Sequence, residues 1–227
     1  MSKDLEKQLA GEYAAQYVED GMVVGLGTGS TVYYTTKKIA ERVKLEGLSL
    51  QFVSTSKGTT ELALSLGLQI RELDEVGQID LTIDGCDEFD PYLNGIKGGG
   101  GALLFEKIVA AASNVNIWVA DQAKEVSTLG QFPLPVEVLP FGSRHTFKKL
   151  EEKGLCPQFR KAQDGSFVLT DSQNLIIDLH LQKVENPETL SQWLNAIPGV
   201  VENGLFLTIA DRVVVANGSG DVRVIQR

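Results

Sequence analysis

Hydrophobic side chains alternate between two periodicities along the first 120 residues. Leucines and tyrosines at helical spacing predict an opening helix over 4–18. Short apolar runs predict buried strands, and 3.6-residue patterns between them predict helices. The expected strands are 22–26, 48–54, 68–73, 79–83 and 115–120, and the expected helices are 31–46, 59–66 and 102–113. Strands that alternate with helices indicate a mostly parallel sheet covered on both faces.

The pattern changes at Phe132-Pro133-Leu134-Pro135, where closely spaced prolines indicate a domain boundary. Beyond it we expect strands at 136–139, 158–161, 167–169, 175–181 and near 200, helices at 143–153 and 187–196, and a hairpin turn at 163–165. This order resembles a ferredoxin-like α+β unit. Three further strands, at 205–209, 213–216 and 222–225, are expected to rejoin the first sheet. We therefore predict an α/β fold in which a Rossmann-like domain (1–131 and 205–227) is interrupted by an insert (132–204).

Composition and charge narrow the possible partners. The chain has 227 residues, 43% of them hydrophobic, and a formal net charge of −9. This acidic balance disfavours nucleic acid and anionic membranes as partners, because both call for a basic surface. A small anionic substrate remains possible, since a few lysines and backbone N–H groups suffice to hold it. Cys86 and Cys156 lack a CxxC spacing, and we expect free thiols and a cytoplasmic location.

A glycine turn, Gly25-Leu26-Gly27-Thr28-Gly29, joins an expected strand to an expected helix. Its small residues allow a tight turn, and Ser30 or Thr31 is expected to cap the helix, whose N-terminus favours an anion. A dinucleotide fingerprint would need glycine in place of Ser30, and an acid after the next strand. Neither is present, so a plain connection and a phosphate- or hydroxyl-binding loop both remain open.

Carboxylates follow directly after the expected strand 79–83. Asp84 and Asp87 flank Gly85-Cys86, and Glu88 and Asp90 come next. Ligands of open parallel sheets collect beyond the carboxyl ends of strands, where carboxylates accept sugar hydroxyls or move their protons. A solvated acidic turn and a site for a hard metal ion are the two alternative interpretations.

The most specific segment is Lys97-Gly98-Gly99-Gly100-Gly101, which precedes an almost wholly apolar helix carrying Glu106. Consecutive glycines are costly in chain entropy, but they let backbone N–H groups approach an anion or a developing oxyanion. Burial of a glutamate among apolar neighbours raises its pKa toward the range of a general base. The alternative, a solvated Glu106–Lys107 face, is weak because the helix offers few other polar residues.

Other polar residues add less. Lys124 follows another expected strand at the same edge, where a surface lysine is the common explanation. His145 and His180 lie far apart and lack cysteine partners at metal spacing, so we do not expect a zinc site.

Taken in order, these segments resemble type A ribose-5-phosphate isomerases over nearly the whole chain. The matching blocks are Gly27–Thr31, Asp84–Glu88, Lys97–Leu103, Glu106–Ile108, Phe132–Val138 and Ala196–Val201. Cys86 departs from the family, which more often has alanine there. The side chain stays small, so only sensitivity to oxidation is in question.

The resemblance implies a role for each matching residue. Glu106 corresponds to the proton acceptor, Asp84 and Asp87 to carboxylates that handle sugar hydroxyls and ring opening, and Lys97 to the group facing the enediolate. The residues implied to contact substrate are Thr28, Gly29, Ser30, Thr31, Asp84, Gly85, Cys86, Asp87, Lys97, Gly98, Gly99, Gly100, Lys124 and, less directly, Lys7. It also implies a phosphorylated pentose as substrate, no metal and no cofactor, and a homodimer or dimer of dimers.

Two other functions fit parts of this pattern. A sugar-phosphate-sensing regulatory domain could share the architecture, but such regulators carry a DNA-binding module before the first strand. Here the first expected strand begins by Met22, which leaves too few residues for such a module. A catalytic glutamate would also be unnecessary in a sensor. A related sugar-phosphate isomerase or deaminase is the nearer alternative.

Overall fold

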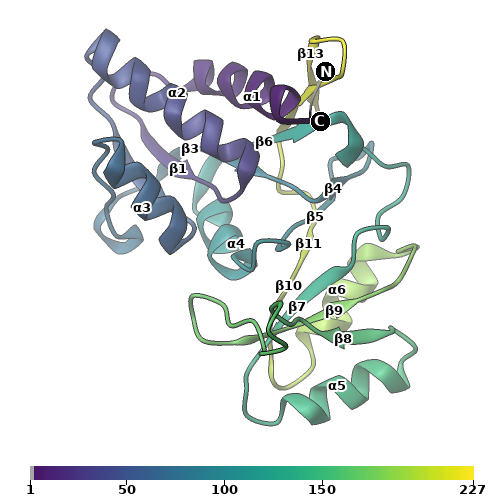
Figure 1. The fold of residues 1–227 in the computed structure, drawn as a ribbon. Coiled ribbons are helices and arrows are strands. Elements are labelled where there is room, and N and C mark those ends of the chain that lie inside the picture. Colours follow the sequence, from purple (N-terminus) through teal and green to yellow (C-terminus); the bar gives the residue numbers. More distant parts are fainter. Residues whose placement is uncertain (1–2) are drawn as a thin grey trace. The chain divides into compact units, whose positions relative to one another are not determined.

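A computed structural model describes residues 3–227 and divides the chain into two compact units, shown in Figure 1. Among the described residues, the first unit comprises 3–86, 105–125 and 208–227, and the second comprises 87–104 and 126–207. Residues 87–104, which the sequence analysis placed in the first domain, therefore group with the second unit.

The first unit is built on a six-stranded sheet in the order β13-β12-β6-β3-β1-β2. Its strands are β1 (Val23–Leu26), β2 (Gln51–Ser54), β3 (Ile79–Gly85), β6 (Ser113–Asp121), β12 (Arg212–Ala216) and β13 (Val222–Gln226). All neighbouring pairs are parallel except β12 with β13. The chain leaves β1 toward β2 on one side and leaves β3 toward β6 on the other. The topological switch point, where ligands of such sheets bind, therefore lies between β1 and β3.

Helices cover both faces of this sheet (Figure 1). The helices α1 (Lys3–Ala14) and α2 (Ser30–Glu46) pack on one face, and α3 (Lys57–Ser65) lies beside the edge strand β2. On the other face, Val109 of α4 (Leu103–Ala111) packs with Val53 and Ile79. The predicted parallel sheet with two covered faces is thus confirmed.

One predicted strand of this unit, 68–73, is wrong. The segment makes a single bridge between Ile70 and Phe52, and a 3₁₀ turn begins at Leu73. The Arg71 N–H still donates to the Phe52 carbonyl at 2.7 Å, and the 3₁₀ turn then ends the pairing before a ladder forms.

The second unit contains a small antiparallel sheet in the order β10-β7-β9-β8. Its elements follow one another as β7 (Leu134–Val138), α5 (Ser143–Glu152), β8 (Pro157–Phe159), β9 (Leu175–Leu179), α6 (Pro187–Asn195) and β10 (Val200–Asn203). This βαββαβ sequence and strand order are those of the ferredoxin-like fold, as predicted. Leu150 of α5, Leu194 of α6 and Ile177 of β9 form its fully buried core.

Two further predictions need correction here. The predicted strand 167–169 makes only isolated bridges, because Phe167 and Leu169 lie half exposed beyond the ends of β8 and β9. The segment 205–209 contributes β11 (Leu205–Phe206), which does not rejoin the first sheet. It pairs with β5 (Gly95–Ile96), which in turn pairs with β4 (Glu88–Phe89). Two-residue strands of this kind carry no period-2 pattern that the sequence could display.

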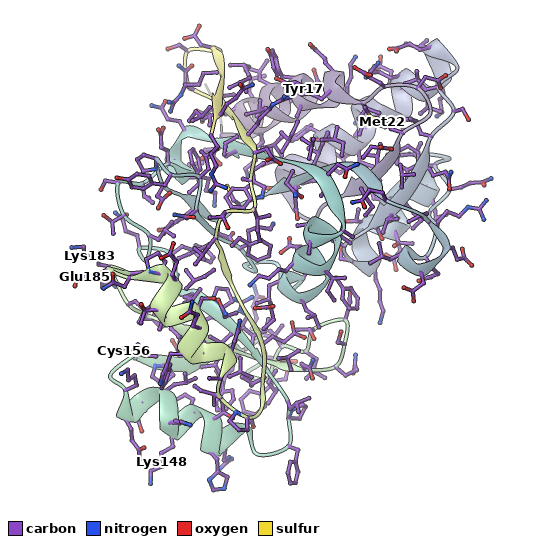
Figure 2. The ribbon with its side chains drawn as sticks, turned by 180° about the vertical axis from the view of Figure 1, so that it is seen from behind. Tyr17, Met22, Lys148, Cys156, Lys183 and Glu185 are labelled. Atoms are coloured by element: carbon purple, nitrogen blue, oxygen red, sulfur yellow. The ribbon has the colours of Figure 1, made fainter. Side chains whose placement is uncertain are left out.

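Both cysteines are free thiols: Cys86 is half-buried, and Cys156 is exposed near α5 (Figure 2). No helix among residues 3–227 is long and apolar enough to cross a membrane.

Candidate active site

The predicted site residues fall into two groups, one in each compact unit. The first group begins in the loop between β1 and α2. Gly29 has φ +121° and ψ 173°, a conformation that favours glycine. The predicted capping by Ser30 or Thr31 is wrong, because α2 begins at Ser30 and Gly29 is its N-cap, without a side-chain hydrogen bond. The first-turn N–H groups of α2 consequently have no intrahelical acceptor and suit an anion.

Asp84, near the end of β3, holds this loop in place. Its Oδ1 atom accepts hydrogen bonds from the N–H of Thr28 at 3.0 Å and from the N–H of Gly85 at 2.7 Å. The parallel register of β1 and β3, with Leu26 opposite Ile83, brings these residues together at the carboxyl edge of the sheet. The side chain is only 3% exposed. Asp84 and the Gly27–Thr31 loop therefore form one structure at the topological switch point.

A cluster of hydroxyl groups from the connection between β2 and α3, and from the first turn of α3, supports the same loop. Thr28 Oγ1 lies 2.7 Å from Thr55 Oγ1 and donates to Ser56 Oγ at 2.8 Å, while Thr59 Oγ1 donates to the Gly27 carbonyl at 2.8 Å. A hollow of about 330 Å³ opens beside this cluster and is lined in part by Gly27, Thr28 and Thr59. Thr28 is a predicted site residue, whereas the hydroxyls of Thr55, Ser56 and Thr59 were not predicted from the sequence.

Glu106 lies in the first turn of α4 and is buried, with 4% of its surface exposed. One turn further on, Val109 packs beneath Gly25 of β1. Phe105 and Ile108 are the exposed residues of this helix, at 37% and 45%. The proposed solvated Glu106–Lys107 face is therefore absent, since the glutamate is inside and two apolar side chains are outside.

Two lysines of the first unit are less closely tied to this group. Lys124 ends the 3₁₀ turn Gln122–Lys124, which follows β6 and is held by a hydrogen bond of 3.1 Å from the Ala123 N–H to Asp121. It thus follows a strand at the carboxyl edge, as expected. Lys7 lies half-buried in α1 and, within residues 3–227, forms no hydrogen bond or ion pair with another predicted site residue. The roles of both stay predictions.

The second group centres on the glycine loop 98–101. Asp87 Oδ2 accepts a hydrogen bond from the Gly99 N–H at 2.7 Å, and a Cβ on Gly99 would lie 2.6 Å from Asp87 Oδ1. Gly98 and Gly101 have φ values of +102° and +80°, and the Gly101 N–H donates to the Gly98 carbonyl at 3.0 Å. The loop therefore requires glycine for its conformation and for its close approach to Asp87.

Lys97 introduces this loop and is buried, with 2% of its surface exposed. Its N–H donates to the Gly204 carbonyl at 2.9 Å, and its ammonium lies 5.4 Å from the centre of the Phe206 ring. A cation over an aromatic face is stabilised electrostatically. The lysine is therefore a fixed positive charge at the start of the loop.

The remaining acids of the 84–90 segment hold backbone. Glu88 accepts hydrogen bonds from the N–H groups of Gly130 and Phe132, and Asp90 accepts from those of Tyr92 and Asn94. Among residues 3–227, no group of three or more His, Cys, Asp or Glu side chains has the geometry of a metal site.

An arginine from the insert also contacts the glycine loop. Arg160 donates to the carbonyls of Gly98 and Gly99 at 2.8 and 3.0 Å, and its guanidinium pairs with Asp178. Neither residue was a predicted site residue, because nothing in the local sequence connects Arg160 to a loop 62 positions away.

These two groups supply the components of acid–base chemistry on a polar anion. The first offers a helix N-terminus, a buried carboxylate on α4 and a carboxylate at the switch point. The second offers a buried ammonium and backbone N–H groups in a glycine loop. A proton acceptor together with fixed positive charge suits proton abstraction next to a carbonyl group.

Comparison with known proteins identifies the same family throughout. A family model described as Ribose 5-phosphate isomerase A (phosphoriboisomerase A) matches residues 51–220. The chain is 54% identical to ribose-5-phosphate isomerase A of Lacticaseibacillus paracasei and 52% identical to that of Levilactobacillus brevis. Each alignment spans 220 residues, 97% of this chain and 96% of the relative.

Solved structures agree. A D-ribose-5-phosphate isomerase in complex with phospho-erythronic acid superposes with a TM-score of 0.96 at 38% identity, covering 100% of both chains. Ribose 5-phosphate isomerase A of Methanocaldococcus jannaschii gives a TM-score of 0.94 at 36% identity, again over 100% of both chains.

Proposed function

The chain belongs to the ribose 5-phosphate isomerase A family, whose members interconvert D-ribose 5-phosphate and D-ribulose 5-phosphate, and on this premise we propose that Glu106 is its proton acceptor. The observation that carries the proposal is a buried carboxylate in the first turn of α4, five residues after the glycine loop. A buried ionisable side chain close to a glycine loop in sequence is a candidate for a functional role. This aldose–ketose isomerisation belongs to the non-oxidative pentose phosphate pathway.

The first step is the opening of the furanose ring, which we assign to Asp84. The carboxylate takes the proton of the C1 hydroxyl while the bond between C1 and the ring oxygen breaks, and it then passes this proton to the ring oxygen. The open form then carries an aldehyde at C1. Asp84 suits this step because its backbone hydrogen bonds fix its position beside the substrate loop.

In the second step Glu106 takes the proton from C2, and the bonding electrons form a C1–C2 double bond with negative charge on O1. Asp87 handles the hydroxyl proton that passes between O2 and O1. Glu106 then returns its proton to C1, and C2 becomes the ketone. Lys97 and the Gly100 N–H of the glycine loop stabilise the negative oxygen of the enediolate, the intermediate whose stabilisation lowers the barrier of the reaction.

We assign the phosphate to the N-terminus of α2, with Ser30 and Thr31 in its first turn, and to Lys124 and Lys7. The first-turn N–H groups of α2 lack intrahelical acceptors, so this helix end favours the binding of a phosphate dianion. The solved relative that binds phospho-erythronic acid holds a ligand with a phosphate and a carboxylate. Such a ligand needs positive potential at both of its ends.

A coupled assay tests the function directly. The purified protein is expected to convert D-ribose 5-phosphate to D-ribulose 5-phosphate, and the Glu106→Gln variant is expected to bind the sugar without converting it. A parallel series with other pentose phosphates ranks its substrates. Full activity of Glu106→Gln would show that Glu106 is not the base. Absence of activity in the wild-type protein would contradict the isomerase function.

We propose further that the predicted α/β domain, residues 1–131 and 205–227, carries the chemistry, and that the insert 132–204 mediates assembly into a homodimer or dimer of dimers, in the cytoplasm. Two free thiols suit a reducing compartment. Light scattering on the full chain measures the assembly state, and a monomer at micromolar concentration would contradict it.

A further inference from the structure

We propose that Arg160 is a positioning residue that sets the geometry of the glycine loop 98–101 and thereby controls turnover. This inference rests on the proposed function, because it concerns the loop assigned to the enediolate oxygen. Arg160 itself is not assigned any contact with substrate.

The loop is fixed from two sides, through the peptide group between Gly98 and Gly99. Its carbonyl accepts from Arg160 at 2.8 Å, and its N–H donates to Asp87 at 2.7 Å. The two ends of a trans peptide point in opposite directions. Arg160 and Asp87 therefore lie on opposite sides of this peptide, and they fix its orientation together with the Gly101 N–H, which also donates to the Gly98 carbonyl.

The next peptide follows the same rule. The Gly99 carbonyl also accepts from Arg160, at 3.0 Å, so the Gly100 N–H points away from the guanidinium. Within residues 3–227 this N–H has no hydrogen-bond partner in the protein. By binding both carbonyls, Arg160 aims two successive N–H groups to the side opposite itself. One is taken by Asp87, and the other is left for a ligand.

Asp178 holds the guanidinium in the orientation that this task requires. Its two oxygens accept from Nε at 2.8 Å and from Nη2 at 2.5 Å, while Nη1 alone serves both glycine carbonyls. Arg160 directly follows β8, and Asp178 lies in β9, on the face that also presents Ile176 to Gly101. Arginine is needed here because a planar fork can serve a carboxylate and a pair of carbonyls at once, whereas the ammonium of lysine cannot.

The test compares four variants in the isomerase assay. Arg160→Met is expected to lower kcat/KM by about 10²-fold, the cost of misplacing a catalytic group by roughly 1 Å, with most of the loss in kcat. Arg160→Lys is expected to recover part of it. Asp178→Asn is expected to show a smaller loss. The double variant Arg160→Met with Asp178→Asn should be no worse than Arg160→Met alone, because the two residues act as one unit.

A matched control separates positioning from loss of stability. Leu150→Val changes a fully buried residue of α5, which packs on the opposite face of the same sheet, and is expected to lower the Tm while leaving kcat unchanged. Normal kcat in Arg160→Met, with Glu106→Gln inactive in the same assay, would overturn the inference and leave the proposed function standing. Equal losses in Leu150→Val and Arg160→Met at equal Tm would overturn it as well. Activity in Glu106→Gln would instead count against the proposed function.

Discussion

The carboxylate of Asp84 lies directly against Gly27, where a Cβ would come within 2.1 Å of Oδ1. No side chain other than hydrogen fits this space. The contact lets Asp84 accept the Thr28 N–H and so ties the end of β3 to the substrate loop.

Gly27→Ala is therefore expected to displace Asp84 and to lower both activity and stability. Overpacking of this kind costs about 1–3 kcal/mol in the free energy of unfolding. Denaturant melts and kcat/KM measure the two effects. Gly58→Ala in α3 is the matched control: nothing lies within 4 Å of its Cβ position, and alanine favours the helix. Equal behaviour of the two variants would contradict the account of Gly27.

Glu106→Gln is expected to lower kcat by roughly 10²–10⁴-fold, the usual contribution of a positioned general base. The amide has the shape of the carboxyl group but cannot accept the proton. The Tm and the affinity for ribose 5-phosphate, measured by calorimetry, should change little. Glu61→Gln, on the exposed side of α3, controls for the loss of one charge. Near-normal kcat in Glu106→Gln would show that another group removes the proton.

The sequence predicted those parts of the fold that have a long periodic pattern. The parallel sheet, its helices and the ferredoxin-like order of the insert follow from apolar runs and their spacing. The three-stranded sheet of β11, β5 and β4 did not, because two-residue strands are determined by tertiary contacts. The strand predicted at 68–73 is wrong because the short alternation of Leu68 and Ile70 with polar residues also occurs where only Ile70 forms a bridge.

The candidate site shows the same division. Glu106, Asp84 and the glycine loop stood out through composition: a buried acid, acids after a strand and four consecutive glycines. The residues that hold these groups in place could not be recognised from composition. Arg160 and Asp178 act on a loop far away in sequence, and the hydroxyl of Thr59 reaches the Gly27 carbonyl across 32 positions. Such supporting contacts depend on the three-dimensional structure, and no local pattern encodes them.

Lys124→Ala is expected to raise KM for the phosphorylated sugar about tenfold or more with kcat largely retained. A contact made equally in ground state and transition state affects binding alone. The effect should shrink with added salt, because the interaction is electrostatic. Lys149→Ala, on the exposed surface of α5, is the control. An unchanged KM at low ionic strength would show that Lys124 does not contact the phosphate.

Glu137 gives the second unit a pH-dependent stability. Burial raises the pKa of this carboxyl, which is 1% exposed, against the opposing effect of hydrogen bonds from Asn174 and Thr170. A raised pKa means that the folded state holds the proton more tightly. The contribution of protonated Glu137 to the free energy of unfolding is thus complete at low pH and is lost as the pH rises through the folded-state pKa.

Glu137→Gln keeps a neutral acceptor at this position. Its Tm relative to wild type is therefore expected to rise from pH 4.5 to pH 8, as the wild-type carboxyl ionises. Glu188→Gln, exposed in the first turn of α6, should show no such trend. A Tm difference for Glu137→Gln that stays constant with pH would contradict the role of burial.

The route of the transferred hydrogen provides the most direct test of the mechanism. Aldose–ketose isomerisation runs either by proton transfer through an enediolate or by a hydride shift, in which a divalent ion polarises both oxygens. The chain offers the components of the first route: a buried carboxylate at Glu106, and Lys97 with its glycine loop. Two acids that a metal would need, Glu88 and Asp90, are already engaged by backbone N–H groups.

Turnover in deuterated water is therefore expected to place solvent deuterium on the carbon that receives the proton, because a proton on Glu106 exchanges with solvent. Some internal return is expected, since a shielded carboxylic acid delivers part of its protons before they exchange. Exhaustive chelation should leave kcat unchanged. Loss of activity on chelation, restored by a divalent ion, would overturn the enediolate route. If no label appears at full speed, a slower variant such as Arg160→Lys gives Glu106 more time to exchange, and absence of label there too would count decisively against proton transfer.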